Sequence, residues 1–417
     1  MIGKFVPTGK LTLKYEDQQV AELSMDFMHN GRPPIVRSAV FEPAEQATAT
    51  LNKPELSREN IERSLTSILG CLNVASKHWI IRQYDHEVLA GSVVKPLVGI
   101  QNDGPSDASV IRPHLRSQRG LAVACGMNPH FGDLDPYHMA ASSIDEAIRN
   151  CVAVGADPDR IAILDNFCWG YTDRPETLGT LVRAAIACHD VAIEYKTPFI
   201  SGKDSLNNEF SFTNSAGDRE TISIPSTLLI SAMGQVDDVS KCVTMDLKSS
   251  GNEMFLLGLT KDEFGGSHYC LVNELVGGEL PTVDAAKNRN LYLALHQAIG
   301  EGLVRSCHDL SEGGLAVAAA EMGFAGGLGI EMQLSTACER AQKDALTILF
   351  SESNGRLLCE VEPEHVEKFK AKFGDLVCHV GEVVDDQNLK ILNQGELLAE
   401  CSLADLKTAW QSPLDWE

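Results

Sequence analysis

The chain has 417 residues, 44% hydrophobic and 22% charged, which is the balance of a globular protein with two or three domains and excludes a disordered chain. Its formal net charge of −23 argues against a general binder of nucleic acid or of anionic membranes. Solubility alone would explain this charge. It does not exclude phosphate ligands, because backbone N–H groups and Mg²⁺ can hold phosphates without basic side chains.

No stretch of the sequence approaches 18 consecutive apolar residues, so no membrane-spanning helix is predicted. Residues 1–13 lack the apolar core of a signal peptide. The twelve cysteines include no C-x-x-C pair, and in a chain of this length they are expected to be reduced, mostly buried thiols. These features together predict a cytoplasmic protein.

In chain order, residues 1–60 look like an attachment and not a domain. Residues 9–15 alternate polar and apolar side chains as a strand does, and residues 18–25 could pair with them as a hairpin. Residues 61–236 alternate helix-like and strand-like segments, which indicates a mixed α/β or α+β layer. Residues 237–417 form a second block of this kind, and no repeat with a period of 20–50 residues is visible.

Two predicted strands of the first block stop abruptly at polar residues. Residues 160–164 are followed by Asp165, and the strand at 198–200 is followed by Ser201 and Gly202. If these strands are neighbours, Asp165 and Gly202 line one cleft. The segment 202–205 is no Walker A motif, because Thr197 stands where that motif requires glycine. A strand followed by Gly, Lys, Asp and Ser still indicates a phosphate and metal edge.

A helix is predicted to start near Ser142. Ser143 and Glu146 have the spacing of a capping box, in which Glu146 only bonds back to the helix end. Asn150 lies four residues after Glu146 on the same helix face, and two such oxygens suit a hard cation such as Mg²⁺. Both interpretations remain open at this point. Gly155 is expected to end the helix.

The segment 307–314, with sequence CHDLSEGG, is the other candidate site. Ser311 can cap the apolar helix that follows, and two glycines in its first turn leave the backbone open to a phosphate. Asp309 would repel a bare phosphate but suits the accompanying metal ion. The alternative is a tight turn with an ordinary cap. Residues 103–108 are, by themselves, only a turn.

Five segments of the chain closely resemble phosphoribosylformylglycinamidine synthase, the ATP-dependent amidotransferase of purine biosynthesis: 83–88, 107–108, 145–150, 311–315 and 349–353. They occur in order, with compatible spacing, over nearly the whole chain. The resemblance covers only the C-terminal half of that synthetase. It implies an aminoimidazole-ribonucleotide-synthetase-like fold of the α+β and α/β classes. Residues 1–60 would be a hairpin and connector, 61–236 a ferredoxin-like domain, and 237–417 an α/β domain.

The resemblance also implies roles for individual residues. At an auxiliary nucleotide site for ATP or ADP, the Mg²⁺ ligands would be Asp107, Glu146, Asn150 and Asp309, with Ser106 and Ser311 contacting the nucleotide. Asp165 and Gly202 would face ATP in the active site, and Ser205 the substrate phosphate. Lys203 replaces an asparagine that binds Mg²⁺ in other members, so Asp204 is a further candidate metal ligand. No catalytic residue is expected in this half.

The implied reaction converts formylglycinamide ribonucleotide, ATP and ammonia into formylglycinamidine ribonucleotide, ADP and phosphate. The implied partners are the N-terminal half of the synthetase and a glutaminase subunit that releases ammonia from glutamine. The isolated chain is expected to be inactive and to form a homodimer. The alternatives are a non-catalytic nucleotide-binding half that scaffolds a partner, and another ATP-dependent enzyme of the same superfamily, such as a selenophosphate or thiamine-phosphate enzyme.

Overall fold

The N-terminal part of the chain forms a small unit of its own. The computed structural model describes residues 2–44 and 49–416, which divide into the compact units Met1–Ala39 and Val40–Glu417. The first unit is an antiparallel hairpin of β1 (Lys10–Tyr15) and β2 (Gln18–Ser24), followed by α1 (Met25–Asn30). The helix begins where the Ser24 hydroxyl accepts a hydrogen bond from the Phe27 N–H. The predicted hairpin is confirmed.

The larger unit begins at Val40, within the segment 1–60 that is predicted to be a hairpin and connector. The Val40 N–H donates to the Pro175 carbonyl at 2.9 Å. Lys53 forms ion pairs at 3.2 Å with both Asp262 and Asp344. The second half of the connector is therefore part of the larger unit. The division of this unit near residue 237 stays a prediction.

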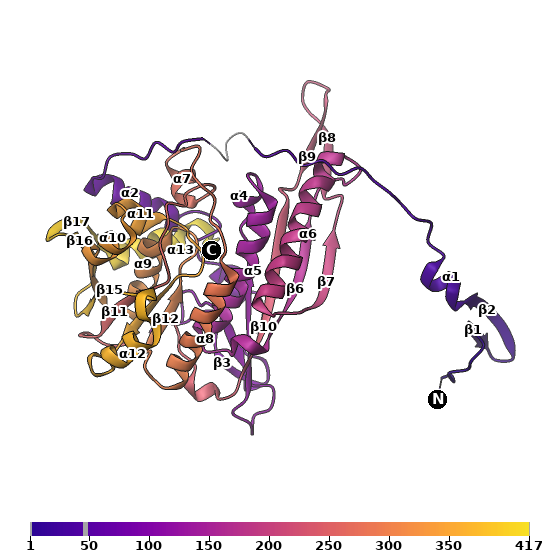
Figure 1. Ribbon diagram of the computed structural model, residues 1–417, viewed down its shortest axis with the longest axis horizontal. Helices are drawn as coiled ribbons and strands as arrows, with labels where there is room; N and C mark the ends of the chain where they lie inside the picture. The colour runs from indigo at the N-terminus through magenta and orange to yellow at the C-terminus, as the bar shows by residue number, and fades with distance from the viewer. Residues whose placement is uncertain (1, 45–48, 417) are drawn as a thin grey trace. The chain divides into compact units, whose positions relative to one another are not determined.

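A six-stranded sheet is the centre of the first block. Only its last two strands run parallel, and the other neighbours are antiparallel. The helices α5 and α6 cover one of its faces (Figure 1). A separate hairpin of β8 (Glu209–Thr213) and β9 (Arg219–Ser223) follows the edge strand. The strands of the sheet, in spatial order, are β3 (Ser92–Val94), β4 (Ser109–Ile111), β5 (Gly120–Gly126), β10 (Thr227–Val236), β6 (Ile161–Cys168) and β7 (Phe199–Ser205).

A seven-stranded sheet is the centre of the second block. Its strands are antiparallel except for one parallel pair, β13 with β16. The helix α9 is buried along its whole length, as its almost wholly apolar sequence predicts. In spatial order the strands are β12 (Ser306–Asp309), β14 (Leu357–Val361), β11 (Glu253–Leu257), β15 (Val377–Val384), β13 (Gly329–Gln333), β16 (Asn388–Asn393) and β17 (Glu396–Ser402).

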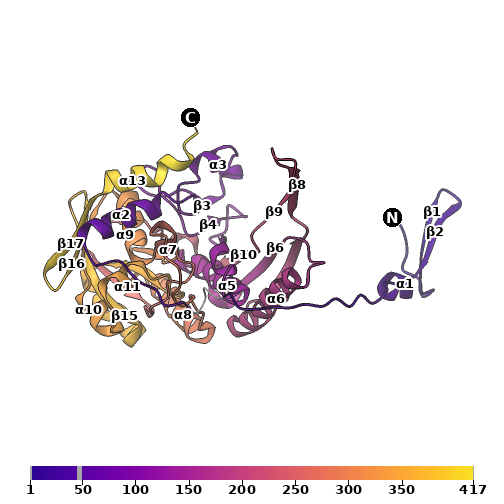
Figure 2. The same cartoon turned by 90° about the horizontal axis from the view of Figure 1, so that it is seen from above.

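The helices pack on these two sheets around one continuous hydrophobic core. The first and last of them, α2 and α13, lie against each other although more than 300 residues separate them (Figure 2). The helices of the larger unit are α2 (Arg58–Leu69), α3 (His78–Arg82), α4 (Pro129–Gly132), α5 (Pro136–Ala153), α6 (Pro175–Tyr195), α7 (His268–Val272), α8 (Ala285–Gly300), α9 (Gly314–Gly326), α10 (Ser335–Ala341), α11 (Ala345–Phe350), α12 (Val366–Phe373) and α13 (Leu403–Gln411).

Three local predictions need correction. The strands β6 and β7 continue through Asp165 and Gly202 instead of ending there, because they pair with each other up to Ser205. The helix α5 begins after Asp135 and not near Ser142. Ser143 is therefore in the middle of the helix, where its hydroxyl donates to the Met139 carbonyl at 3.0 Å, so it forms no capping box with Glu146.

Candidate nucleotide and metal site

A cavity of about 420 Å³ lies where α5, β12 and the start of α9 meet. Four of the predicted site residues line it: Ser106, Glu146, Asp309 and Ser311. Part of the remaining wall is apolar and is formed by Ile81, Pro96, Leu97 and Trp410. The cavity therefore combines a charged end with an apolar wall.

Asp309, at the charged end of the cavity, forms a buried acidic cluster with Asp107, which does not itself line the cavity. One Asp107 oxygen, Oδ1, accepts hydrogen bonds from the Asp309 N–H and from His308 Nδ1, both at 2.9 Å. The other ring nitrogen of His308 lies 2.9 Å from Glu321. Burial alone lowers the pKa of His308, but Asp107 and Glu321 raise that pKa well above its usual range. His308 is therefore an imidazolium ion between two carboxylates.

Arg149 fixes the second carboxylate of the cluster. Its guanidinium donates to Asp309 Oδ2 from Nε at 3.2 Å and from Nη2 at 3.0 Å, and it also donates to the Ser311 hydroxyl at 2.9 Å. Burial raises the pKa of Asp309, but Arg149 and His308 outweigh it, so the net pKa is lowered. Asp309 is therefore ionised in this site. The Ser311 hydroxyl donates to Asp309 and not to the helix end. The prediction that Ser311 caps α9 is therefore wrong.

Glu146 and Asn150 approach the site from α5. Glu146 accepts hydrogen bonds from the Met127 N–H and the Asn128 amide, both at 3.0 Å. Burial, then Glu312 and Asp309, raise the pKa of Glu146 well above its usual range. Asn150 does not line the cavity. Its amide nitrogen donates to the Cys125 carbonyl at 3.3 Å, which leaves its oxygen free.

Two groups that the sequence did not single out complete the cavity wall. Burial raises the pKa of Glu312 to about 7, to which the Glu352 carboxylate adds although His268 opposes it. Lys77 also lines this cavity, and burial lowers its pKa. The sequence contains a signal for the role of Arg149, because this residue follows Asp145 by four positions on one helix, the spacing of an ion pair. It contains no signal for the role of Lys77.

The donor set fits a hard divalent cation. Asp107 Oδ2 and Asn150 Oδ1 are buried oxygens without a hydrogen-bond partner. The Asp107 and Asp309 carboxylates lie in one cluster with His308, whose two ring nitrogens are already bonded to Asp107 and Glu321 and so supply no ligand. Carboxylate and amide oxygens are the ligands that Mg²⁺ prefers, and unpartnered buried oxygens are costly unless a cation satisfies them.

The remaining predicted residues lie elsewhere, on β6 and β7. Asp165 and Gly202 are direct neighbours across the two parallel strands, as predicted. A Cβ on Gly202 would lie 2.6 Å from Asp165 Oδ1, so the glycine leaves that carboxylate accessible. Asp204 shares their sheet face, whereas Lys203 and Ser205 share the opposite face, where they are hydrogen-bonded. No residue of this group lines the 420 Å³ cavity.

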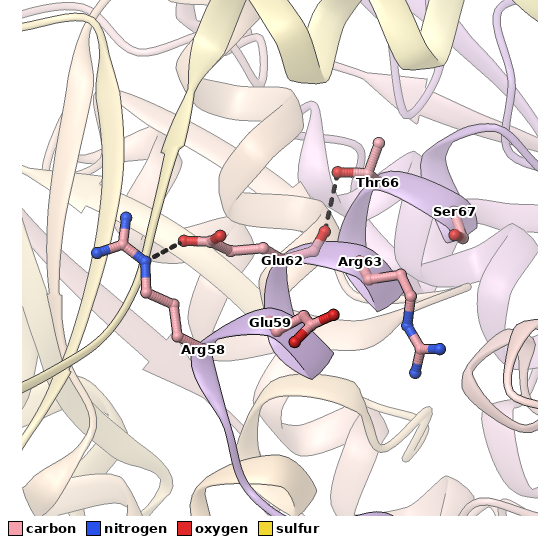
Figure 3. Close-up of a pocket in the computed structure, with 6 residues that line it drawn as sticks. All are labelled: Arg58, Glu59, Glu62, Arg63, Thr66 and Ser67. Atoms are coloured by element: carbon pink, nitrogen blue, oxygen red, sulfur yellow. Dashed lines mark hydrogen bonds and ion pairs between the residues drawn. The ribbon is translucent and has the colours of Figure 1, made fainter.

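A wider hollow of about 630 Å³ lies along α2, but it is an open helix surface (Figure 3). Arg58 pairs with Glu62 at 2.7 Å, and the Thr66 hydroxyl donates to the Glu62 carbonyl at 2.8 Å. These charges satisfy one another at the surface, where solvent screens the ion pair. The hollow contains no predicted site residue.

Two family models match the blocks of the larger unit. The N-terminal domain of AIR synthase related proteins matches residues 105–223, and the C-terminal domain of the same proteins matches residues 249–392. The chain therefore belongs to the AIR synthase related proteins. This membership, together with the two mixed sheets, confirms the predicted fold class.

Within this family the chain is similar to phosphoribosylformylglycinamidine synthase subunit PurL, which confirms the resemblance found in the sequence. It is 29% identical to the Thermoplasma volcanium protein over 100% of this chain and 52% of that protein. It is 31% identical to the Thermococcus sibiricus protein over 94% of this chain and 52% of that protein. The chain thus spans about half the length of the curated relatives it matches.

Solved structures show the same fold. Thermotoga maritima PurL complexed with FGAR superposes with a TM-score of 0.62 at 18% identity, over 85% of this chain and 54% of that one. Structures of that protein complexed with ATP, and of PurLQS from the same organism, superpose with TM-scores of 0.59 and 0.62.

Among the described residues of our chain, no helix is long and apolar enough to cross a membrane.

Proposed function

We propose that this chain is one half of a phosphoribosylformylglycinamidine synthase, a carbon–nitrogen ligase of purine biosynthesis. The observation that carries the proposal is the cavity together with the unpartnered buried oxygens of Asp107 and Asn150, in a chain similar over its full length to PurL proteins. The substrates would be formylglycinamide ribonucleotide, ATP and ammonia. The FGAR and ATP complexes of the Thermotoga maritima protein support this choice.

The cavity is proposed to bind ATP or ADP with Mg²⁺. Asp107, Glu146, Asn150 and Asp309 would hold the cation, which would neutralise the phosphate charge. Ser106, Ser311 and the N–H groups at the start of α9 would contact the phosphates. The apolar wall that includes Trp410 would receive the base.

Asp165, Gly202, Asp204 and Ser205 are proposed to belong to a separate active-site cleft at the sheet edge formed by β6 and β7, where Ser205 lies on the opposite face from the other three. Asp165 and Gly202 would face ATP, Ser205 the substrate phosphate, and Asp204 a metal ion. In the reaction the substrate amide oxygen attacks the γ-phosphorus of ATP and ADP leaves. Ammonia then displaces phosphate from the activated carbon. This cleft needs a second side from a partner chain, so the chain alone should not turn over.

The proposed partner is the N-terminal half of the synthetase, which would cover the sheet face opposite α5 and α6. Val123 and Met233 are opposite each other on this face and are 40% and 39% exposed. An uncovered apolar sheet face favours association. Without the N-terminal half, a second copy of the chain would take this place as a homodimer. A glutaminase subunit would supply the ammonia.

A complementation assay tests the proposal. The chain, the N-terminal half, and a mixture of the two are each given formylglycinamide ribonucleotide, ATP, Mg²⁺ and ammonium chloride. We expect formylglycinamidine ribonucleotide and ADP only from the mixture. A mixture without product would favour the non-catalytic, scaffolding function, and product from the chain alone would reject the need for a partner. Light scattering of the chain alone should show a dimer.

A further inference from the structure

The N-terminal unit, made of β1, β2 and α1, repeats the elements β16, β17 and α13 near the end of the larger unit. The hairpin β1–β2 and the hairpin β16–β17 have the same register when a constant offset carries Lys10 onto Asn388. Lys10 pairs with Ser24 and Asn388 with Ser402, and each hairpin has its irregularity at the corresponding step, after Leu13 and after Ile391. No insertion or deletion is needed from Lys10 to Asn30.

The correspondence extends to the turn and to the helix. Glu16 and Gln394 occupy the same turn position, and both have left-handed backbones with φ of 52° and 51°. The helices α1 and α13 start at the corresponding residue, directly after Ser24 and Ser402. Sequence alone hides the repeat, because only four pairs in this stretch are identical: Leu11 with Leu389, Ala21 with Ala399, Glu22 with Glu400 and Ser24 with Ser402.

The two copies differ in what covers them. The strand β16 pairs in parallel with β13, and α13 packs on α9 and α2. This buries Leu389, Ile391, Leu403 and Leu406 to 3% exposure or less. Their counterparts in the N-terminal unit are 38–49% exposed: Leu11, Leu13, Met25 and Met28. The N-terminal unit thus presents the buried face of such an element without its covering.

We propose that the N-terminal unit completes the sheet of another protein's α/β domain. The strand β1 would pair in parallel with a strand that corresponds to β13, and α1 would cover that domain as α13 covers this one. The occupant is therefore an AIR-synthase-type α/β domain with an open β13-like edge. This chain's own β13 does not qualify, because β16 already occupies its edge.

The inference rests on the proposed function, since the N-terminal half of the synthetase is the protein expected to carry such a domain. It adds a second contact between the two chains, made through backbone hydrogen bonds at a sheet edge and a small apolar face. The pairing of β16 with β13 in this chain serves as the template for the register. Leu389 and Ile391 are opposite Ile330 and Met332, so Leu11 and Leu13 should be opposite the corresponding residues of the partner's strand.

The test uses the full chain and the N-terminal half of the synthetase, cut before the sequence that corresponds to residue 10. Leu13→Asp places a carboxylate in the proposed contact and should weaken binding at least about tenfold in ultracentrifugation. Thr12→Asp is the matched control on the outer face of the same strand, and its affinity should stay within about twofold of the unmodified chain. Equal affinities of the two variants would overturn the inference.

Hydrogen exchange of the unmodified chain gives a readout that does not depend on the variants folding. Amides of residues 11–14 that do not bond to β2 should be protected in the complex and not in the free chain. Absence of protection in the complex would overturn the inference. Protection in the free chain that rises with protein concentration would also overturn it, because this would show that a second copy of the chain covers β1. Product formation is measured separately: protection without product rejects only the proposed function, and product without protection rejects only this inference.

Discussion

At the scale of residues, the candidate site is held together by charge pairs that run between distant parts of the chain. Arg149 joins α5 to Asp309 at the end of β12, and His308 joins that strand to Asp107 and Glu321. Each pair engages one carboxylate oxygen. This leaves oxygens such as Asp107 Oδ2 directed at no protein group, which is the arrangement a cation site requires.

Asp309→Asn should reduce the nucleotide-dependent stabilisation of the protein. The amide keeps an oxygen that can accept from Arg149 but loses the charge that a divalent cation needs, so Mg²⁺ and ATP should bind more weakly. The measurement is the rise in melting temperature on adding Mg²⁺-ATP, which should fall to less than half of its value in the unmodified protein. Asp284→Asn, at an exposed helix cap, is the control. An unchanged rise in the Asp309 variant would contradict the assignment.

Glu312 predicts a pH dependence of stability. Its pKa is about 7 in the folded chain, mainly through burial, against about 4.3 for an unfolded glutamate. Between these values the folded state holds a proton that the unfolded state has lost, so stability falls as the pH rises from 5 to 7. Glu312→Gln has no such proton. The difference in melting temperature, variant minus unmodified protein, should therefore increase between pH 5 and pH 8. A difference that stays constant over this range would refute the prediction.

At the scale of elements, the start of α9 depends on two glycines. Gly313 and Gly314 have φ of 77° and 63°, in the left-handed region that suits glycine. A Cβ on Gly314 would overlap the Ser351 carbonyl oxygen and lie 3.0 Å from that of Leu349. The turn therefore allows close packing against the end of α11 and the segment after it.

Gly314→Ala should destabilise the protein by about 2 kcal/mol or more, because it adds both backbone strain and a steric clash with backbone atoms. The matched control is Gly300→Ala at the end of α8, where a Cβ would meet no atom within 4 Å. That change should be neutral or stabilising by less than about 1 kcal/mol. Thermal melting of the two variants distinguishes them, and similar melting temperatures would contradict the argument.

At the scale of the larger unit, one buried carboxylate joins its two blocks. Asp145 on α5 accepts hydrogen bonds from Asn288 at 2.9 Å, Tyr292 at 2.8 Å and the Gly355 N–H at 3.2 Å. Arg149 and Tyr195 also donate to it. The partners come from α5, α6, α8 and the segment before β14, so this carboxylate fixes how the blocks face each other around the cavity.

Asp145→Ala should cost about 3–5 kcal/mol, because it leaves the buried Arg149 charge without its nearest counter-ion. Lys287→Ala provides the comparison, since its ion pair with Asp284 is exposed and should contribute at most about 1 kcal/mol. Chemical denaturation of both variants measures the difference. A loss below about 1 kcal/mol for the Asp145 variant would show that the blocks are held together in another way.

Much of the fold follows from local sequence patterns. Local patterns predict the paired strands at 9–15 and 18–25, observed as β1 and β2, and the apolar helix after Ser311, observed as α9, since spacing along the chain alone decides which side chains share a face. The motifs around Glu146 and Asp309 likewise identify residues that the structure brings into one cavity.

Tertiary structure decided the rest. Lys77 and Arg149 have roles that depend on neighbours more than 150 residues away, as in the pair of Arg149 with Asp309. The ends of β6 and β7 were misplaced because backbone pairing between the two strands carries polar residues that local propensity would exclude. The repeat of β16, β17 and α13 in the N-terminal unit also became visible only in the structure, because register and turn geometry persist where few side chains are identical.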